Sequence, residues 1–204
     1  MPTDTHVEEP IDGRTARAVR TKDAIVDATL ALIDEGDLRP TGPRIAERAG
    51  VSVRSIFQHF DDLDALFFAV GERVVVRIAA LIQPIDPAEP LPERTQAFLA
   101  QRAVVMESLT PVLRAALVHA ASSTVIRSQF ENGHQFLVAQ IDQVFAPEIE
   151  AAGAGGPVLR DGLVVALSWS SWDLLRGAQG RTVEEAREVA ASIVGALLAG
   201  AATA

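Results

Sequence analysis

The sequence contains no cysteine, and this absence removes several kinds of chemistry at once. Without thiols there is no disulfide framework, no cysteine nucleophile and no thiolate metal site. The N-terminus, MPTDTHVEEP, is acidic and polar, unlike a secretory signal. We therefore expect a protein of the reducing cytoplasm.

Tyrosine is also absent, and aromatic residues make up only 5% of the chain. Apolar and polar residues rarely alternate with a period of two, so the signals for β-strands are sparse. Apolar residues instead recur at helical spacing, and Gly and Pro divide the chain into helix-sized segments. Because 49% of the 204 residues are apolar, a sizeable core can form. The sequence predicts an all-α fold.

Long uncharged apolar runs are missing too. None reaches the roughly 20 residues that a transmembrane helix needs. The nearest is residues 189–204, which are rich in Ala and contain two Gly. We expect a buried helix there and no membrane partner.

Helical periodicity and its interruptions predict nine helices and several breaks. Residues 83–92 contain four prolines and form the expected linker, and further breaks are expected at Pro111, 147–157 and 177–180. The predicted helices cover residues 17–34, 42–49, 53–59, 62–82, 93–107, 111–120, 122–146, 158–176 and 183–200.

Charge is distributed unevenly along the chain. The formal net charge is −9, which by itself argues against a nucleic-acid partner. Residues 13–60, however, hold eight Lys and Arg against six Asp and Glu, whereas residues 61–204 hold ten against seventeen. The basic excess is confined to one short stretch, where a nucleic-acid contact would be sought.

That stretch contains TGPRIAERAGVSVRSIFQHF, residues 41–60. Gly50 allows a sharp turn between two short helices, and the small Ala49 lets them approach closely. Ile45 and Val51 can fill the space between them. Such a helix-turn-helix can lay its second helix in the DNA major groove, which is ~12 Å wide.

The exposed face of this second helix carries side chains suited to reading bases. Arg54 can pair with guanine and Gln58 with adenine, each good pair discriminating by ~1–3 kcal/mol, and Val53 can meet a thymine methyl. Ser52, Ser55 and the helix N-terminus can hold phosphate oxygens. The candidate DNA-binding residues are Thr41, Arg44, Arg48, Ser52, Val53, Arg54, Ser55, Phe57, Gln58 and His59.

Several of these assignments have alternatives. The two helices could form a hairpin that binds no DNA, although their polar face has nothing obvious to pack against. Phe57 is expected to be partly buried, with stacking near the sugar–phosphate backbone as the alternative. His59 is either a phosphate contact or an ordinary surface residue. The row of Arg14, Arg17 and Arg20 could contact DNA or form a solvated helix face.

From about Arg17 to Val70 the sequence resembles the TetR family of transcriptional regulators. The resemblance rests on AIVDATLALIDEG, T…IAERAGVS, IFQHF and DDLDALFFAV in this order and spacing. It implies a three-helix DNA-binding domain at 14–61 and a ligand-binding and dimerisation domain at 62–204. The acidic composition of residues 1–13 predicts a disordered tail before them. The resemblance further implies a homodimeric repressor that binds a near-palindromic operator in double-stranded DNA. A small-molecule effector would release the repressor from this operator, and we expect that effector to be apolar.

The chain departs from the usual family pattern at three positions. Phe57 stands where the family usually has tyrosine, and Leu63 where it often has lysine, so two phosphate contacts are lost. Arg54 replaces the usual glycine and can restore some attraction for DNA. These departures leave open a second hypothesis, a helical small-molecule-binding protein whose DNA-binding head is degenerate.

The C-terminal part offers less specific signals. In the resemblance, the last two helices build a four-helix dimer interface, for which we expect Leu163, Val164, Leu167, Leu174, Val189, Ile193, Val194 and Leu197. The large apolar residues of this part are expected by default to pack in the core or the dimer interface, with the wall of a ligand pocket as the alternative. The candidate ligand-binding residues are Phe98, Met106, Phe130, Phe136, Trp169 and Trp172. Neither His119 nor His134 has a carboxylate at metal-site spacing, and no enzyme motif occurs. We therefore expect no metal, cofactor or enzymatic activity.

Overall fold

The computed structural model describes residues 13–120 and 123–201, and this part of the chain is all-α, as predicted. The expected acidic tail lies outside the described residues except for Gly13, which begins the first helix. The helices are α1 (Gly13–Asp34), α2 (Gly42–Ala49), α3 (Val53–His59), α4 (Leu63–Ala79), α5 (Leu91–Ala120), α6 (Thr124–Val144), α7 (Ala146–Ala151), α8 (Gly156–Ala166), α9 (Trp169–Asp173) and α10 (Val183–Ala201), with a 3₁₀ turn η1 (Gly153–Gly155) and a π-helical turn η2 (Leu174–Ala178).

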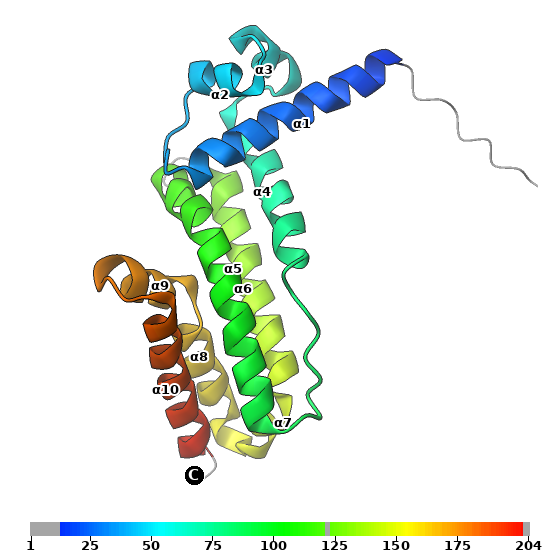
Figure 1. Ribbon diagram of the computed structural model, residues 1–204. Coiled ribbons are helices and arrows are strands. Elements are labelled where there is room, and N and C mark those ends of the chain that lie inside the picture. Colours follow the sequence, from blue (N-terminus) through cyan, green and yellow to red (C-terminus); the bar gives the residue numbers. More distant parts are fainter. Residues whose placement is uncertain (1–12, 121–122, 202–204) are drawn as a thin grey trace, which may run out of the picture.

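The molecule is elongated, with α1–α3 at one end (Figure 1). Helix α4 leads from this end into a bundle in which α5 and α6 run antiparallel. Helices α8 and α10 pack together beside α5, and α10 ends on the side of the molecule opposite α3 (Figure 1). The small end can therefore meet a partner that the bundle does not touch.

One hydrophobic cluster joins the small end to the bundle. It begins among α1–α4 with residues such as Ile45 and Ile56 and continues to Met106 and Trp172. A second cluster fills the far half of the bundle. There the rings of Phe98 and Phe145 pack edge to face, with their centroids 5.7 Å apart. Since the first cluster crosses residue 61, the division into domains at that point stays a prediction.

The break expected at Pro111 is wrong, because α5 continues through it. Proline has no backbone N–H and loosens the preceding turn, which deprives carbonyl groups of their partners. Here the carbonyl of Ser108 accepts a hydrogen bond from Nη2 of Arg77 on α4, at 2.8 Å. The same guanidinium pairs with Asp34, at the end of α1, at 2.8 Å. A side chain from another helix thus satisfies an acceptor in the turn that precedes the proline.

Three other boundaries differ from the prediction. The break expected at 147–157 is mostly helical, because Pro147 and Pro157 lie in the first turns of α7 and α8, where proline is tolerated. The helix expected at 158–176 is interrupted instead, since Ser168 caps a new helix by accepting from the backbone N–H of Ser171 at 3.2 Å. The break expected at 177–180 falls at 179–182.

Helix α5 is long and apolar enough to cross a membrane by length and composition. It lies in the middle of the bundle (Figure 1) and contributes buried residues to both clusters. Its Arg94 is only 3% exposed and pairs with Glu148 at 2.6 Å. The C-terminal helix, expected to be buried, packs on α8 and α5 through Ala186, Ala190, Val194 and Leu198. Both helices pack as core helices do.

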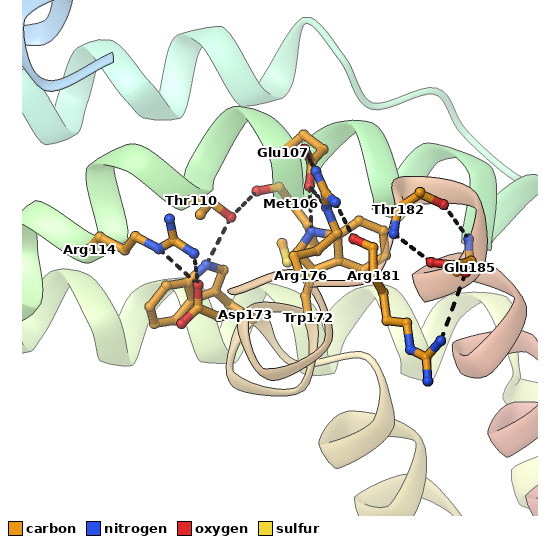
Figure 2. A network of polar contacts seen from close by, with 11 residues as sticks. Met106, Glu107, Thr110, Arg114, Trp172, Asp173, Arg176, Arg181, Thr182 and Glu185 are labelled. Atoms are coloured by element: carbon orange, nitrogen blue, oxygen red, sulfur yellow. Dashed lines mark hydrogen bonds and ion pairs between the residues drawn. The ribbon is translucent and has the colours of Figure 1, made fainter. Parts of the chain in front are cut away.

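A polar network fastens α9 and η2 to α5 (Figure 2). Glu107 on α5 accepts hydrogen bonds from Nε1 of Trp172 at 2.8 Å and from Nε of Arg176 at 2.9 Å. Further along α5, Arg114 pairs with Asp173 at 2.8 Å. The hydrogen bond from Arg176 lowers the pKa of Glu107, which partial desolvation opposes and the Trp172 hydrogen bond assists. The network therefore favours the ionised carboxylate.

Replacing Glu107 with Gln should lower the melting temperature at neutral pH, because Arg176 loses its ionic partner. A carboxyl group whose pKa is lowered on folding stabilises the protein above its ordinary pKa of 4.5, and this contribution disappears as the pH falls through the lowered value. The difference between wild type and variant in thermal unfolding should therefore shrink in acid. The control is Asp142→Asn, which removes a solvent-exposed pair with Arg160. An equal difference at every pH would contradict this role.

Candidate nucleic-acid interface

The turn between α2 and α3 requires a glycine. Gly50 adopts φ 65° and ψ 34°, the left-handed region that residues with a side chain rarely enter. Its N–H donates to the carbonyl of Glu47 at 3.2 Å, and the N–H of Val51 donates to that of Ala46 at 2.9 Å. These bonds close the end of α2 and turn the chain towards α3.

Helix α3 is fixed at its start by a cap and along its length by burial. Oγ of Ser52 accepts a hydrogen bond from the backbone N–H of Ser55 at 3.1 Å. Ile56 and Phe60 are 1% and 4% exposed, which confirms them as core residues. Because these two side chains must face α1 and α2, the opposite side of α3 faces outwards.

The outward face of α3 consists of Val53, Arg54, Phe57 and Gln58, and all four are exposed. At about 100° per residue they span a single arc of the helix. Phe57 is more open than the expected partial burial, with 53% of its surface exposed, because Ile56 takes the inward position beside it. In residues 13–120 and 123–201, the side chains of Arg54 and Gln58 make no hydrogen bond or ion pair. Their polar groups are available to a ligand.

The two arginines of α2 are engaged by acidic residues. Nη1 of Arg44 lies 2.5 Å from Oδ2 of Asp37, and Nη1 of Arg48 lies 2.9 Å from Oε2 of Glu35. The hydrogen bond from Arg48 lowers the pKa of Glu35. Neither acid was predicted from the sequence, although both stand in the segment EGD at 35–37. Both side chains of the Arg48–Glu35 pair are exposed, and exposed pairs of this kind contribute little to stability.

The remaining candidates lie around α3. Thr41 precedes α2 and is exposed, and its side chain makes no capping hydrogen bond within the described chain. Ser55 and His59 are half-buried on the inner side of α3. Arg17 and Arg20 are exposed on α1, while the side chain of Arg14 lies outside the described residues.

The six candidate ligand-binding residues do not gather around one space. Phe98 borders a cleft of roughly 200 Å³ between residues 82–85, α5 and α6. Met106 and Trp172 border a much smaller space between α5, α9 and α10. Trp169 donates from Nε1 to Thr110 at 3.1 Å, and Phe136 is 48% exposed on α6. Phe130, also on α6, is half-buried.

One family model matches the part of the chain that contains the small end. Residues 25–70 match the family model for bacterial regulatory proteins of the tetR family. No curated protein matches the chain.

Solved structures share the fold over nearly the whole chain. A candidate TetR-family transcriptional regulator from Mesorhizobium loti has a TM-score of 0.66 and 20% identity, covering 90% of this chain and 98% of its own. A candidate transcriptional regulator from Pseudomonas aeruginosa has a TM-score of 0.63 and 21% identity, with 95% and 99% covered. A transcriptional regulator from a Rhodococcus species has a TM-score of 0.62 and 17% identity, with 90% and 96% covered.

Replacing Gly50 with Ala should destabilise the protein by about 1 kcal/mol, because the left-handed backbone is strained for a residue with Cβ. The added Cβ meets no atom within 4 Å, so the backbone is the source of the loss. The control is Gly133→Ala within α6, where Cβ also meets open space and Ala should stabilise by about 1 kcal/mol. Denaturant unfolding measures both changes. A stabilised Gly50→Ala variant would be incompatible with the turn described.

Proposed function

We propose that this chain, whose residues 25–70 match the model for bacterial regulatory proteins of the tetR family, is a transcriptional regulator of that family. More specifically, we propose that it is a dimeric repressor that a small molecule releases from its operator. The proposal rests above all on the outward face of α3. Arg54 and Gln58 offer planar donors and acceptors of the kind that read guanine and adenine in the major groove. Val53 and Phe57 add apolar surface for thymine methyl groups or sugar rings.

The surroundings of α3 supply contacts to phosphate. Ser52, Thr41 and the arginines of α2 are exposed around the reading face. Arg44 and Arg48 keep 58% and 43% of their side chains exposed, so they can exchange Asp37 and Glu35 for phosphate oxygens. This exchange offsets the phosphate contacts that Phe57 and Leu63 cannot make.

A single seven-residue helix reads only a few base pairs, so we propose that two copies act together. Four of the residues expected at the dimer interface, Leu163, Val164, Leu167 and Val194, are instead buried within the chain itself, because they face the second cluster. The exposed apolar residues of this region are Val158, Val165, Leu174 and Ile193.

Val158 and Val165 are 75% and 66% exposed, one above the other on α8, and Ile193 on α10 is 43% exposed. The two helices approach closely at Gly162, where a Cβ atom would lie 3.1 Å from Cδ2 of Leu197. A paired surface of two helices is self-complementary about a twofold axis, which would cover the apolar side chains of both copies. Two reading helices would then face a near-palindromic operator, with half-sites ~34–36 Å apart.

The effector would act by favouring a state in which the two reading helices no longer fit successive grooves. A differential affinity of a few kcal/mol is enough for this. Arg77 offers a mechanical route, since it ties the end of α1 to the turn before Pro111 in α5. We place the protein in the cytoplasm with its DNA, and we propose no catalytic role. A degenerate DNA-binding head is the alternative, which DNA binding itself tests.

Substituting Arg54 with Ala should cost ~1–3 kcal/mol on the operator and relax preference at one base pair, while binding to random DNA changes little. Mobility shifts on the DNA upstream of its own gene, compared with random duplexes, measure both. Arg127→Ala, an exposed arginine on α6, is the control and should alter neither. An equal loss on both kinds of DNA would contradict base reading by Arg54.

Substituting Val165 with Glu should convert the dimer to a monomer, because the twofold contact would bury two like charges. Light scattering at micromolar concentration measures the mass. The matched control is Val75→Glu on α4, where the valine is 63% exposed against 66% for Val165. A Val165→Glu protein that remains dimeric would refute the proposed surface.

A further inference from the structure

Arg102 is a cation inside the bundle without an acidic partner. It lies on α5, and its Nε donates to the carbonyl of Leu167 at 3.0 Å. No Asp or Glu in residues 13–120 and 123–201 forms an ion pair with it. Two other arginines of the bundle do have acidic partners. Arg94 on α5 pairs with Glu148, and Arg176 on η2 pairs with Glu107 on α5. Arg102 is therefore charged without compensation.

The surroundings of Arg102 raise the free energy of its charged form. Burial lowers the pKa of Arg102 to about 10, because the apolar protein around the guanidinium replaces water. The group remains protonated at neutral pH and keeps part of its surface accessible. A desolvated cation with accessible N–H groups has a strong preference for an anion beside it.

Arg102 lines a small space between α5, the end of α8, α9 and α10. Arg187 on α10 lines the same space, and no Asp or Glu does so among the described residues. The rest of the wall is mainly apolar and includes Leu99, Met106, Trp172 and Leu175. Two arginines thus line one space whose wall is otherwise mainly apolar.

In this structure the space admits no more than about one water molecule. Its outer wall consists of α9 and the π-helical turn η2, which α5 holds through the polar network of Figure 2. Such π turns are frequent at functional sites, and the unbranched side chain of Met106 adapts readily to a change in shape. Entry of a larger ligand would require this wall to repack.

We propose that Arg102 and Arg187 bind the carboxylate of a small amphipathic anion, whose apolar part packs against Met106 and Trp172. This inference rests on the proposed function, since it names the chemical class of the effector. A guanidinium presents paired N–H donors that match the two oxygens of a carboxylate. Binding would also restore a counter-charge to Arg102.

The cleft near Phe98 is the competing location. Gln83, Gln101, Gln140 and Gln143 line it, with no charged side chain among the residues described there. That chemistry suits a neutral polar ligand. A neutral effector would therefore bind at the glutamines and would not depend on Arg102.

Tryptophan fluorescence tests the proposal directly, because Trp169 and Trp172 are the two tryptophans of the chain and both lie on α9. The probes are octanoate and phenylacetate, each compared with its neutral counterpart, 1-octanol or phenylacetamide. The carboxylates should cause a saturable change in emission. Arg102→Gln should weaken their apparent affinity roughly tenfold or more, and Arg187→Gln several-fold.

The matched control is Arg160→Gln, which removes an arginine of α8 that pairs with Asp142 outside this space. It should leave carboxylate affinity unchanged. Arg102→Gln removes a desolvated charge and should fold with an unchanged or higher melting temperature. Arg102→Lys keeps the charge and should retain part of the affinity, which separates loss of charge from a change in packing.

Operator binding by the same samples separates this inference from the proposed function. Octanoate or phenylacetate should release the wild-type protein from DNA and release Arg102→Gln only at higher concentration. If the protein binds its operator but neither carboxylate changes the fluorescence, the inference is wrong and the proposed function stands. Equal carboxylate affinity in wild type and Arg102→Gln, or a response only to the neutral probes, would also overturn it. Failure to bind any DNA would instead refute the proposed function.

Discussion

The orientation of α3 depends on the burial of Ile56 and Phe60. These side chains anchor the helix against α1 and α2, and the left-handed turn at Gly50 permits that approach. Because an α-helix advances about 100° per residue, fixing the inner side also fixes the outer side. Arg54 and Gln58 are therefore held outwards by core packing rather than by polar contacts of their own. A short helix can serve as a reading surface for this reason.

The reading end is joined to the bundle by both apolar and polar contacts. One hydrophobic cluster extends from α1–α4 to α5 and α9. Arg77 then ties Asp34 to the carbonyl of Ser108, and Glu107 ties Arg176 and Trp172 to the same part of α5. Changes around α9 can thus reach α1 through a single helix. The proposed effector in the bundle would act on the DNA-binding end along this path.

The sequence predicted the parts of this structure that local patterns determine. The turn at Gly50, the cap at Ser52 and the burial of Ile56 and Phe60 follow from residues within a few positions of one another. The features that were missed depend on distant partners. Arg77 supports the turn that Pro111 loosens, and Leu163 is taken into the core of its own chain. The partners of Arg44 and Arg48 likewise follow from the path of the chain between α1 and α2.

We propose that two outward-facing copies of α3 read DNA sequence together. Selection of bound duplexes from a random DNA pool by the purified protein is the decisive experiment. We expect enrichment of a near-palindrome whose half-sites lie about one helical turn, or a small multiple of it, apart. A pool that remains random after repeated selection, even at low ionic strength, would contradict it.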